Sequence, residues 1–331
     1  VLLRVTACPR VDGDISASYH AGLGKAREVA DAIRTTDLDT SLLSGDSIEL
    51  SFSPTCSQTE YEHRVERVKE YIHAGDTFQA NISQQLTGTS TCHPLQIFSA
   101  LRTGNPAPYS ALLEFPEIEL MCASPELLLE CIDGTVTTEP IAGTRPRGAT
   151  TPSDEANEAE LRQDEKERAE HAMLVDLERN DLGKIATVGS VFVDEYRRVD
   201  RYSSVMHLVS RISGDLRPDK SVIDAVASVF PGGTITGAPK PRTMEIIDEM
   251  EQSARGPYTG SIGAFGFDDR ATLNIIIRTI VRENDRFSLR VGGGIVHDSV
   301  PEKEYQETLD KARGLIDAIE SAQTSLTDLR Q

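Results

Sequence analysis

The sequence predicts an α+β fold built around large antiparallel β-sheets. Short runs of strand-forming residues, separated by turns, follow one another closely at 78–86, 109–115, 119–122, 127–132 and 135–138. Helical patterns do not alternate strictly with these runs, as they would around a parallel doubly wound sheet. With 331 residues, 38% of them hydrophobic, the chain can bury one large core or two small ones.

The second half of the chain mixes helices with further strands. A long polar helix is predicted from about Pro152, with Ser153 as its cap, to Gly183, where glycine in the C′ position would end it. Further helices are expected at 61–74, 223–229, 242–251 and 301–322, and further strands at 190–193, 205–212, 260–267, 272–281 and 287–291.

A polar stretch over 44–58 marks a domain boundary. It separates a partial N-terminal subdomain, residues 1–55, from a larger domain, residues 56–331. Because the chain opens on Val rather than Met, we expect that the N-terminal subdomain is truncated.

The composition excludes some classes of partner. The chain has 34 Lys and Arg against 53 Asp and Glu, a formal net charge of −19, which repels a nucleic-acid backbone. Only eight of these cations are Lys, a bias that fits a surface adapted to high salt. The sequence has neither an apolar run of about 18 residues nor a signal-peptide pattern, so we expect no membrane partner and a cytoplasmic protein. The five scattered cysteines predict reduced thiols rather than disulfides or a zinc site.

Two pairs of glutamates have the spacing that places side chains on one face of a helix. Glu304 and Glu307 share such a face with Lys311 on the predicted last helix. Glu167 and Glu170 repeat the spacing on the long polar helix. Two such pairs can surround one hard divalent cation such as Mg²⁺, which prefers carboxylate and water oxygens. The spacing alone leaves open the alternative of a solvated acidic stripe.

Three glycines and one arginine lie where an anion could bind. Gly292, Gly293 and Gly294 end a predicted strand, where backbone amides can approach an anion without hindrance from side chains. Arg278 lies in an apolar strand, where an unpaired guanidinium is costly. It is therefore expected to meet either a buried anionic ligand or an internal acidic partner.

Two further residues have both a structural and a functional interpretation. His207 lies in an apolar strand and fits a core histidine as well as a catalytic one. Glu126 lies at a turn before an apolar strand. Neither position decides its role by itself.

Nine sequence blocks form a recognisable series. They are GDTFQANISQ (75–84), NPAPYSALLEF (105–115), ASPELLL (123–129), EPIAGTRPRG (139–148), DEKERAEHAMLVDLERNDLG (164–183), VDRYSSVMHLVS (199–210), FPGGTITGAPKPRTMEIIDEME (230–251), GSIGAFGFDDRATLNIIIRT (260–279) and GGGIVHDSVPEKEYQETLDKA (292–312). Through them the chain resembles the chorismate-binding enzyme family over about 76–318. The resemblance implies two large antiparallel sheets flanked by helices, with an active-site cleft between them. Residues 56–331 would be the chorismate-binding catalytic domain.

The resemblance also implies a magnesium cofactor. Glu170 and Glu307 would bind Mg²⁺ directly or nearly so, and Glu167 and Glu304 would hold its water ligands. Chorismate is a dicarboxylate, which a protein of charge −19 could bind only with the help of a metal and placed cations.

The remaining candidate residues acquire substrate-binding roles from the same resemblance. Lys311 and the amides of 292–294, together with Mg²⁺, would meet the ring carboxylate of chorismate, and Arg278 would meet its enolpyruvyl carboxylate. Glu126 would be the general acid that protonates the departing C4 hydroxyl, with His207 beside that hydroxyl. Three more substrate-binding positions are Ala142, Thr144 and Thr234.

Gln79 narrows the choice of nucleophile in the reaction. Family members that add water, the isochorismate and salicylate synthases, carry a Lys base at the position of Gln79. Without that base, the resemblance implies ammonia as the nucleophile. The ammonia would come from glutamine through a separate amidotransferase subunit, because no glutaminase Cys-His-Glu unit is visible in the chain.

The product of the reaction is predicted from the residues within these blocks. FPGGTITGAPK, GGGIV and NISQ favour the p-aminobenzoate branch, that is, aminodeoxychorismate synthase component I. The alternative is anthranilate synthase component I, which forms anthranilate and pyruvate. Ala142 fits that alternative, because many aminodeoxychorismate synthases have there a Lys that attacks C2. Ala264 departs from it, because anthranilate synthases usually place a Tyr near the enolpyruvyl group at that position.

Two other classes are less consistent with the sequence. A non-catalytic chorismate- or Ca²⁺-binding module would need the glutamate pairs without Glu126 and His207. A purely structural acidic domain would need no buried Arg278.

Overall fold

The computed structural model describes residues 14–35, 52–90, 92–202 and 205–328, with side chains as far as residue 322. The chain divides into two compact units, 1–44 and 45–331. The first contains helix α1 (Ile15–Thr35), in which no residue is buried. Throughout the described segments, no helix is both long and apolar enough to cross a membrane. A subdomain over 1–55 stays a prediction, although residues 53 and 54 belong to the larger unit and pair there with residues 87 and 86.

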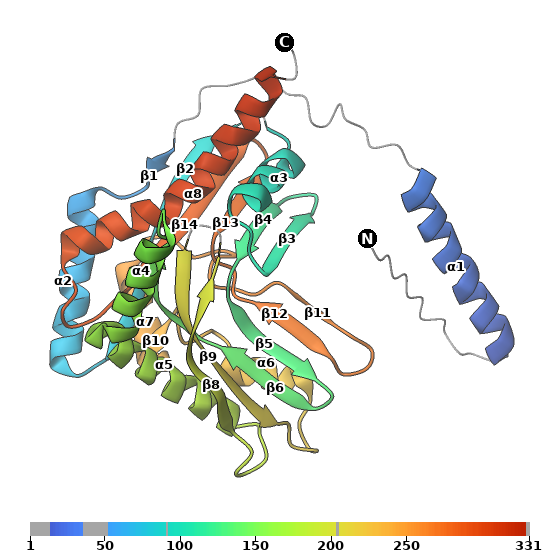
Figure 1. Ribbon diagram of the computed structural model, residues 1–331, viewed down its shortest axis with the longest axis horizontal. Helices are drawn as coiled ribbons and strands as arrows, with labels where there is room; N and C mark the ends of the chain where they lie inside the picture. The colour runs from blue at the N-terminus through green and yellow to red at the C-terminus, as the bar shows by residue number, and fades with distance from the viewer. Residues whose placement is uncertain (1–13, 36–51, 91, 203–204, 329–331) are drawn as a thin grey trace. The chain divides into compact units, whose positions relative to one another are not determined.

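The first sheet of the larger unit has seven antiparallel strands. Their order is β1-β2-β14-β13-β4-β3, with β10 also paired to β2 (Figure 1). The bounds are β1 Ser53–Pro54, β2 Gln79–Thr89, β3 Tyr109–Glu114, β4 Glu119–Ser124, β10 Gly237–Ala238, β13 Thr279–Glu283 and β14 Arg286–Ile295. β14 pairs with β2 along its whole length but with β13 only from Arg286 to Leu289. Within the described ladders, the end of β14 that contains residues 292–294, its glycine end, therefore has no partner strand on the side of β13.

The second sheet also has seven antiparallel strands, in the order β11-β12-β5-β6-β9-β7, with β8 also paired to β9. The bounds are β5 Leu127–Ile132, β6 Thr135–Glu139, β7 Ile141–Pro146, β8 Phe192–Arg201, β9 Val205–Asp215, β11 Gly263–Phe265 and β12 Ala271–Asn274. The prediction of two large antiparallel sheets is confirmed.

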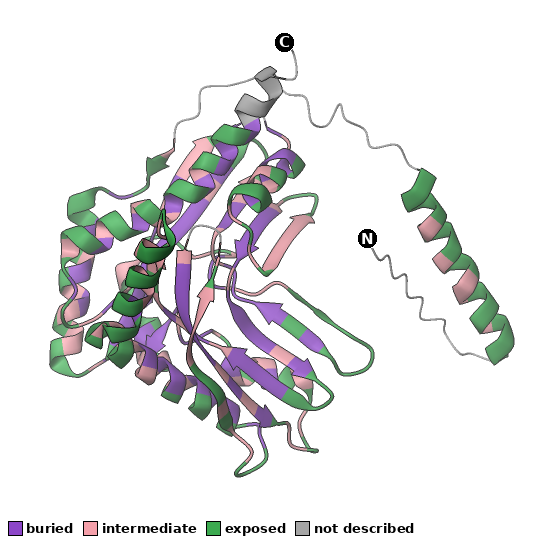
Figure 2. Ribbon diagram, in the orientation of Figure 1, coloured by how far each residue is buried: buried purple, intermediate pink, exposed green. Residues whose placement is uncertain are grey.

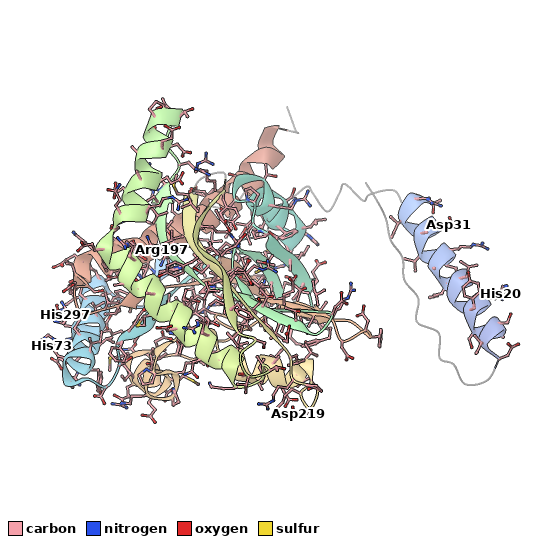
Figure 3. All side chains as sticks on the ribbon, turned by 60° about the horizontal axis from the view of Figure 1, so that its bottom comes forward. His20, Asp31, His73, Arg197, Asp219 and His297 are labelled. Carbon is pink, nitrogen blue, oxygen red and sulfur yellow. The ribbon has the colours of Figure 1, made fainter. Side chains whose placement is uncertain are left out.

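Helices cover both sheets and bury their apolar faces. The bounds are α2 Gln58–Ala74, α3 Pro94–Gly104, α4 Thr151–Gln163, α5 Glu165–Gly183, α6 Val222–Val229, α7 Lys240–Met250 and α8 Pro301–Asp328. Side chains of α3 and α8 share one core with the first sheet, and α5 and α6 share another with the second (Figure 2). The end of α2 is joined to the turn before α8 by His73 and His297, whose rings stack with centroids 4.9 Å apart (Figure 3).

The backbone crosses from one sheet to the other at two neighbouring points. β4 passes into β5 through 125–126, and β12 passes into β13 through 275–278. Two hydrogen bonds join the crossings: Ala123 N donates to Arg278 O at 3.1 Å, and Ile275 N donates to Glu126 O at 3.1 Å. The prediction of one strand over 272–281 is wrong, because the chain changes sheets within it and Arg278 adopts a left-handed φ of 51°.

The long polar helix predicted from Pro152 to Gly183 is two helices. It breaks at Asp164, which caps α5 by accepting a hydrogen bond from Glu167 N at 3.1 Å. The cap of α4 is Thr150, and Ser153 is the N3 residue that completes the capping box with it. Gly183 is still helical, and Lys184 follows it in the right-handed conformation, so no left-handed glycine ends α5.

We expect Asp164→Ala to lower the free energy of unfolding by about 1–2 kcal/mol, because α5 loses its cap. The Asp164 carboxylate also accepts a hydrogen bond from Arg145 at 2.8 Å, and this contact is lost as well. Urea unfolding at neutral pH in molar KCl measures the change. Glu155→Ala, at an exposed glutamate of α4, is the control and should change stability by less than about 0.5 kcal/mol. Equal losses in the two variants would contradict the capping role.

Candidate active site

A cavity of about 620 Å³ lies between the two sheets and is walled by α5 and α8. Strands of both sheets contribute to it, which agrees with the predicted cleft. The predicted site residues in its wall are Gln79, Glu126, Ala142, Thr144, Glu167, Glu170, His207, Thr234, Arg278, Gly292, Gly294, Glu304, Glu307 and Lys311. Of the predicted set, only Gly293 is not part of the wall. The fold thus brings together residues that are up to 232 positions apart in sequence, from Gln79 to Lys311.

Glu126 is a buried carboxylic acid at the first sheet crossing. Its side chain is 4% exposed, and burial raises its pKa to about 7. The backbone N–H of Ile141 lies 3.5 Å from its Oε1. A large share of Glu126 therefore carries a proton at neutral pH, as a general acid requires.

His207 faces the same cavity as an uncharged imidazole. Burial, with a contribution from the positive charge of Arg278, lowers its pKa to about 4. Its Nδ1 forms a hydrogen bond with Thr144 Oγ1 at 2.9 Å. The site therefore has a neutral ring that can accept or donate a hydrogen bond without adding positive charge.

Arg278 lies at the second crossing with its guanidinium in the cavity wall. Among the residues that the structure describes, no acidic side chain forms an ion pair with it and nothing accepts a hydrogen bond from it. Burial lowers its pKa, as expected for a guanidinium without a close counter-ion. Of the two sequence interpretations, the internal ion pair is not found in the described part of the chain, and the ligand anion stays a prediction.

Tyr258 also lines this cavity and was missed by the sequence analysis. Burial raises its pKa to about 12, so its hydroxyl stays protonated and can donate a hydrogen bond. That hydroxyl lies near Gly292, where a Cβ atom would be only 2.9 Å from it. Ala264, at the position where the resemblance places a Tyr in anthranilate synthases, is exposed on β11 and is not part of the cavity wall. No local pattern distinguishes Tyr258 from a core aromatic residue, so only the fold reveals it.

The glutamates of α5 and α8 meet across the glycine end of β14. A Cβ on Gly293 would lie 3.2 Å from Glu304 Oε2 and 3.8 Å from Glu307 Oε1. A Cβ on Gly294 would lie 3.3 Å from Glu170 Oε1. The glycines therefore leave room for carboxylates from both helices to approach the strand. Because this end of β14 is unpaired toward β13, alternate N–H groups there point away from β2 and are open to a ligand.

Each of these carboxylates either pairs with another side chain of the protein or has a pKa that burial shifts. Lys311 Nζ lies 2.6 Å from Glu307 Oε1 and donates to Gly292 O at 2.9 Å. Burial opposes ionisation of Glu307, but Lys311 outweighs it and lowers the Glu307 pKa. Glu170 accepts a hydrogen bond from Gln79 at 2.8 Å, yet burial, with repulsion from Glu167, raises its pKa to about 7.

The other two carboxylates follow the same pattern. Arg145 donates to Glu167 at 3.2 Å, and burial raises the Glu167 pKa. Burial also raises the pKa of Glu304. Arg145, a further residue that the sequence analysis missed, pairs in addition with Glu160 and Asp164.

The donor set suits a hard cation. In the described ranges, no three Asp, Glu, His or Cys side chains already converge as a metal centre. The four carboxylates nevertheless line one cavity wall. Burial raises the pKa of three of them, whereas Glu307 is half exposed and Lys311 lowers its pKa. Oxygen ligands of this kind, beside three glycines of β14 that carry no side chains, fit Mg²⁺.

The geometry of this site agrees with what comparison with known proteins finds. The chain matches the chorismate binding enzyme family over residues 16–317 and therefore belongs to that family. It is 61% identical over 323 residues to "Anthranilate synthase component 1 3" of Haloarcula marismortui, a match that covers 97% of this chain and 64% of the relative. It is 48% identical over 270 residues to "Aminodeoxychorismate synthase component 1" of Bacillus subtilis, covering 82% of this chain and 57% of the relative.

A solved structure has the same fold. Anthranilate synthase component I from Streptococcus pneumoniae superposes with a TM-score of 0.81 at 37% identity, covering 89% of this chain and 66% of that chain. The chain thus spans about two thirds or less of the length of these relatives. The resemblance inferred from the nine sequence blocks is confirmed at the level of the family.

We expect Glu126→Gln to become more stable than the parent protein as pH rises. The folded-state pKa of Glu126, about 7, lies above its ordinary value of 4.5. The proton bound by the folded state therefore stabilises it below pH 4.5, and this stability is lost as pH rises through 7. Gln has no such loss, so the difference in unfolding free energy should grow by up to about 3 kcal/mol between pH 5 and pH 8.

Urea unfolding at both pH values measures this difference. Glu155→Gln, at an exposed position, is the control and should show no comparable change. A constant difference between Glu126→Gln and the parent would mean that Glu126 is not a buried acid of raised pKa.

Proposed function

We propose that this chain is the chorismate-binding subunit of an enzyme that aminates chorismate with ammonia. The observation that carries the proposal is the pairing, in one cavity, of a buried acid with a partly buried guanidinium that forms no ion pair with a described side chain. Glu126 can protonate a leaving hydroxyl, and Arg278 can bind a carboxylate of a dicarboxylate substrate. Membership of the chorismate binding enzyme family supplies the substrate class.

The proposed first step is an addition with loss of water. Ammonia forms a bond to C2 of the ring, the ring double bonds shift, and the C4–O bond breaks. Glu126 gives its proton to the departing hydroxyl, which leaves as water. The added ammonia loses one proton, so the number of protons is the same before and after the step. Because expulsion of hydroxide would be prohibitive, a protonated carboxylic acid at this place is a chemical requirement.

Gln79 supports ammonia rather than water as the nucleophile. An amide cannot take a proton from water, whereas ammonia has a free lone pair and needs no base before it attacks. Gln79 is also held in place, because its Nε2 donates to Glu170 at 2.8 Å. We infer that a separate glutamine amidotransferase subunit supplies the ammonia. The designation "component 1" in the names of the relatives supports a second component.

A magnesium ion fits the carboxylates of α5 and α8. We infer that Glu170 and Glu307 hold it, with Glu167 and Glu304 around them. When bound, the ion would supply positive charge that offsets the ring carboxylate of chorismate. Lys311 would add to that charge from the same helix, and the open N–H groups of the glycine end of β14 would orient the carboxylate.

Anthranilate is the product that we favour. Ala142 is buried in the cavity wall, so this position offers no amine to occupy C2, and ammonia can bond there itself. Loss of the C2 proton and cleavage of the C3–O bond would then release pyruvate and leave an aromatic ring. The 61% and 59% identity with two relatives named anthranilate synthase component 1 supports the same branch. 4-Amino-4-deoxychorismate, the product that the sequence blocks favour, becomes the second candidate. FPGGTITGAPK and NISQ still support it, and a relative named aminodeoxychorismate synthase component 1 is 48% identical.

The product decides between these branches. Purified protein incubated in molar KCl with chorismate, Mg²⁺ and ammonium should release anthranilate and an equal amount of pyruvate, measured by fluorescence and mass. 4-Amino-4-deoxychorismate without pyruvate would establish the other branch. Isochorismate, or no change in chorismate at any ammonium concentration, would contradict amination itself.

Removal of one metal-binding carboxylate should abolish turnover while the fold stays intact. For Glu307→Ala we expect kcat/KM to fall about 100-fold or more, since several kcal/mol of charge stabilisation are lost. Glu302→Ala, at an exposed glutamate on the same helix, is the control and should keep full activity. EDTA should abolish the activity of the parent protein, and added Mg²⁺ should restore it. Full activity after chelation would disprove the metal site.

A further inference from the structure

Residues 230–239, which we call the threonine loop, insert a short segment into the cavity wall. Gly232 lies against Ile275 of the second crossing, where a Cβ atom would be 2.8 Å from Ile275 Cδ1. Gly233 lies against α5, where a Cβ atom would be 2.6 Å from Leu177 Cδ2. A side chain at either position would have to displace the tip of Ile275 or of Leu177, so the loop packs closely between the helix and the crossing. The next residue, Thr234, faces the cavity.

Thr234 has an unusual hydroxyl. It is buried, and no atom in the described part of the chain meets full hydrogen-bond geometry with it, so its interaction with Glu126 is at most a weak hydrogen bond. It lies near the carboxyl group of Glu126, and this proximity partly opposes the rise of the Glu126 pKa that burial causes. The hydroxyl is therefore placed to stabilise the Glu126 carboxylate after that group has given up its proton.

One buried ion pair closes the threonine loop at its base. Lys240, at the start of α7, pairs with Asp181 on α5, and their side chains are 12% and 2% exposed. The same Lys240 Nζ donates to Val229 O, at the end of α6, at 2.7 Å. Lys240, the residue that follows the loop, is thus bonded both to α5 and to Val229, the residue that precedes the loop. Lys184 pairs with the other oxygen of Asp181 at 2.7 Å, but its side chain is 56% exposed and it does not touch the loop in the described structure.

Two further bonds hold the loop on either side of Thr234. Glu178 Oε1, on α5, accepts a hydrogen bond from Gly233 N at 3.1 Å. Arg255 Nη1 donates to Ile235 O at 2.9 Å. The position of Thr234 is therefore fixed from both neighbours, and the ion pair fixes the ends of the loop.

We propose that Lys240 and Asp181 are positioning residues that hold the threonine loop so that Thr234 stays beside the acid Glu126. A buried ion pair is often no more stabilising than apolar side chains of the same size, so stability alone does not account for it. Lys240 does not line the cavity, and it acts through the loop. The proposal rests on the proposed function in one respect, namely that Glu126 is the acid of the reaction.

The activity test compares two lysines that share one carboxylate. In Lys240→Met we expect kcat per folded molecule to fall about tenfold or more, because Thr234 moves relative to Glu126. KM should stay within about threefold, because the residues that bind the carboxylates are untouched. Lys184→Met, the same chemical change at the exposed partner, should leave both constants unchanged. Lys240→Arg, which keeps the charge and a donor, should recover most of the kcat.

A second measurement does not depend on activity. Hydrogen–deuterium exchange of the amides in 230–239, followed by mass spectrometry in molar KCl, should rise in Lys240→Met and stay unchanged in Lys184→Met. The folded fraction of each variant, from thermal unfolding, normalises both measurements.

The outcomes separate this proposal from the proposed function. Unchanged hydrogen–deuterium exchange of the threonine loop in folded Lys240→Met overturns the proposal that Lys240 holds this loop, whatever the activity of the variant. Raised exchange with unchanged kcat per folded molecule also overturns it, because the loop would then move without consequence. A parent protein that does not turn over chorismate overturns the proposed function, and the exchange measurement still decides whether Lys240 holds the loop.

Discussion

The site depends on the two adjacent points where the chain changes sheets. Two backbone hydrogen bonds, Ala123 N to Arg278 O and Ile275 N to Glu126 O, tie these crossings together. Each crossing interrupts a strand, and an interrupted strand can turn a polar side chain into the space between the sheets. Glu126 and Arg278 therefore lie on two crossings whose backbones are hydrogen-bonded to each other.

Burial then gives these groups their chemical character. The same desolvation raises the pKa of Glu126 toward neutrality and lowers that of His207, so the acid keeps its proton and the imidazole stays uncharged. In a chain with 53 acidic residues, the few cations that line the cavity gain importance, because they offset the negative charge of the glutamates around them. The acidic surface, in turn, repels polyanions.

Much of this arrangement could be predicted from sequence, and the failures have identifiable physical causes. Helical spacing correctly grouped Glu304 with Glu307, and a glycine run correctly marked a strand that side chains must approach. Strand pattern could not reveal the crossing within 272–281, because an apolar run looks the same whether it stays in one sheet or enters another. Tyr258 was missed because an aromatic residue has no local signal for cavity or core. The break at Asp164 was missed because a capping aspartate inside an acidic helical stretch resembles its neighbours.

Helix α5 has a consequence for how this protein can vary. Its 19 residues carry Glu167 and Glu170 near one end and Glu178 and Asp181 near the other. A helix turns by about 100° per residue, so inserting or deleting a single residue between these pairs would rotate one pair away from the cavity. Substitutions on the outer face of α5 can accumulate freely, whereas changes in its length cannot. Length variation should therefore be confined to the segment that follows α5, because only Asp164 separates α5 from α4 at its other end.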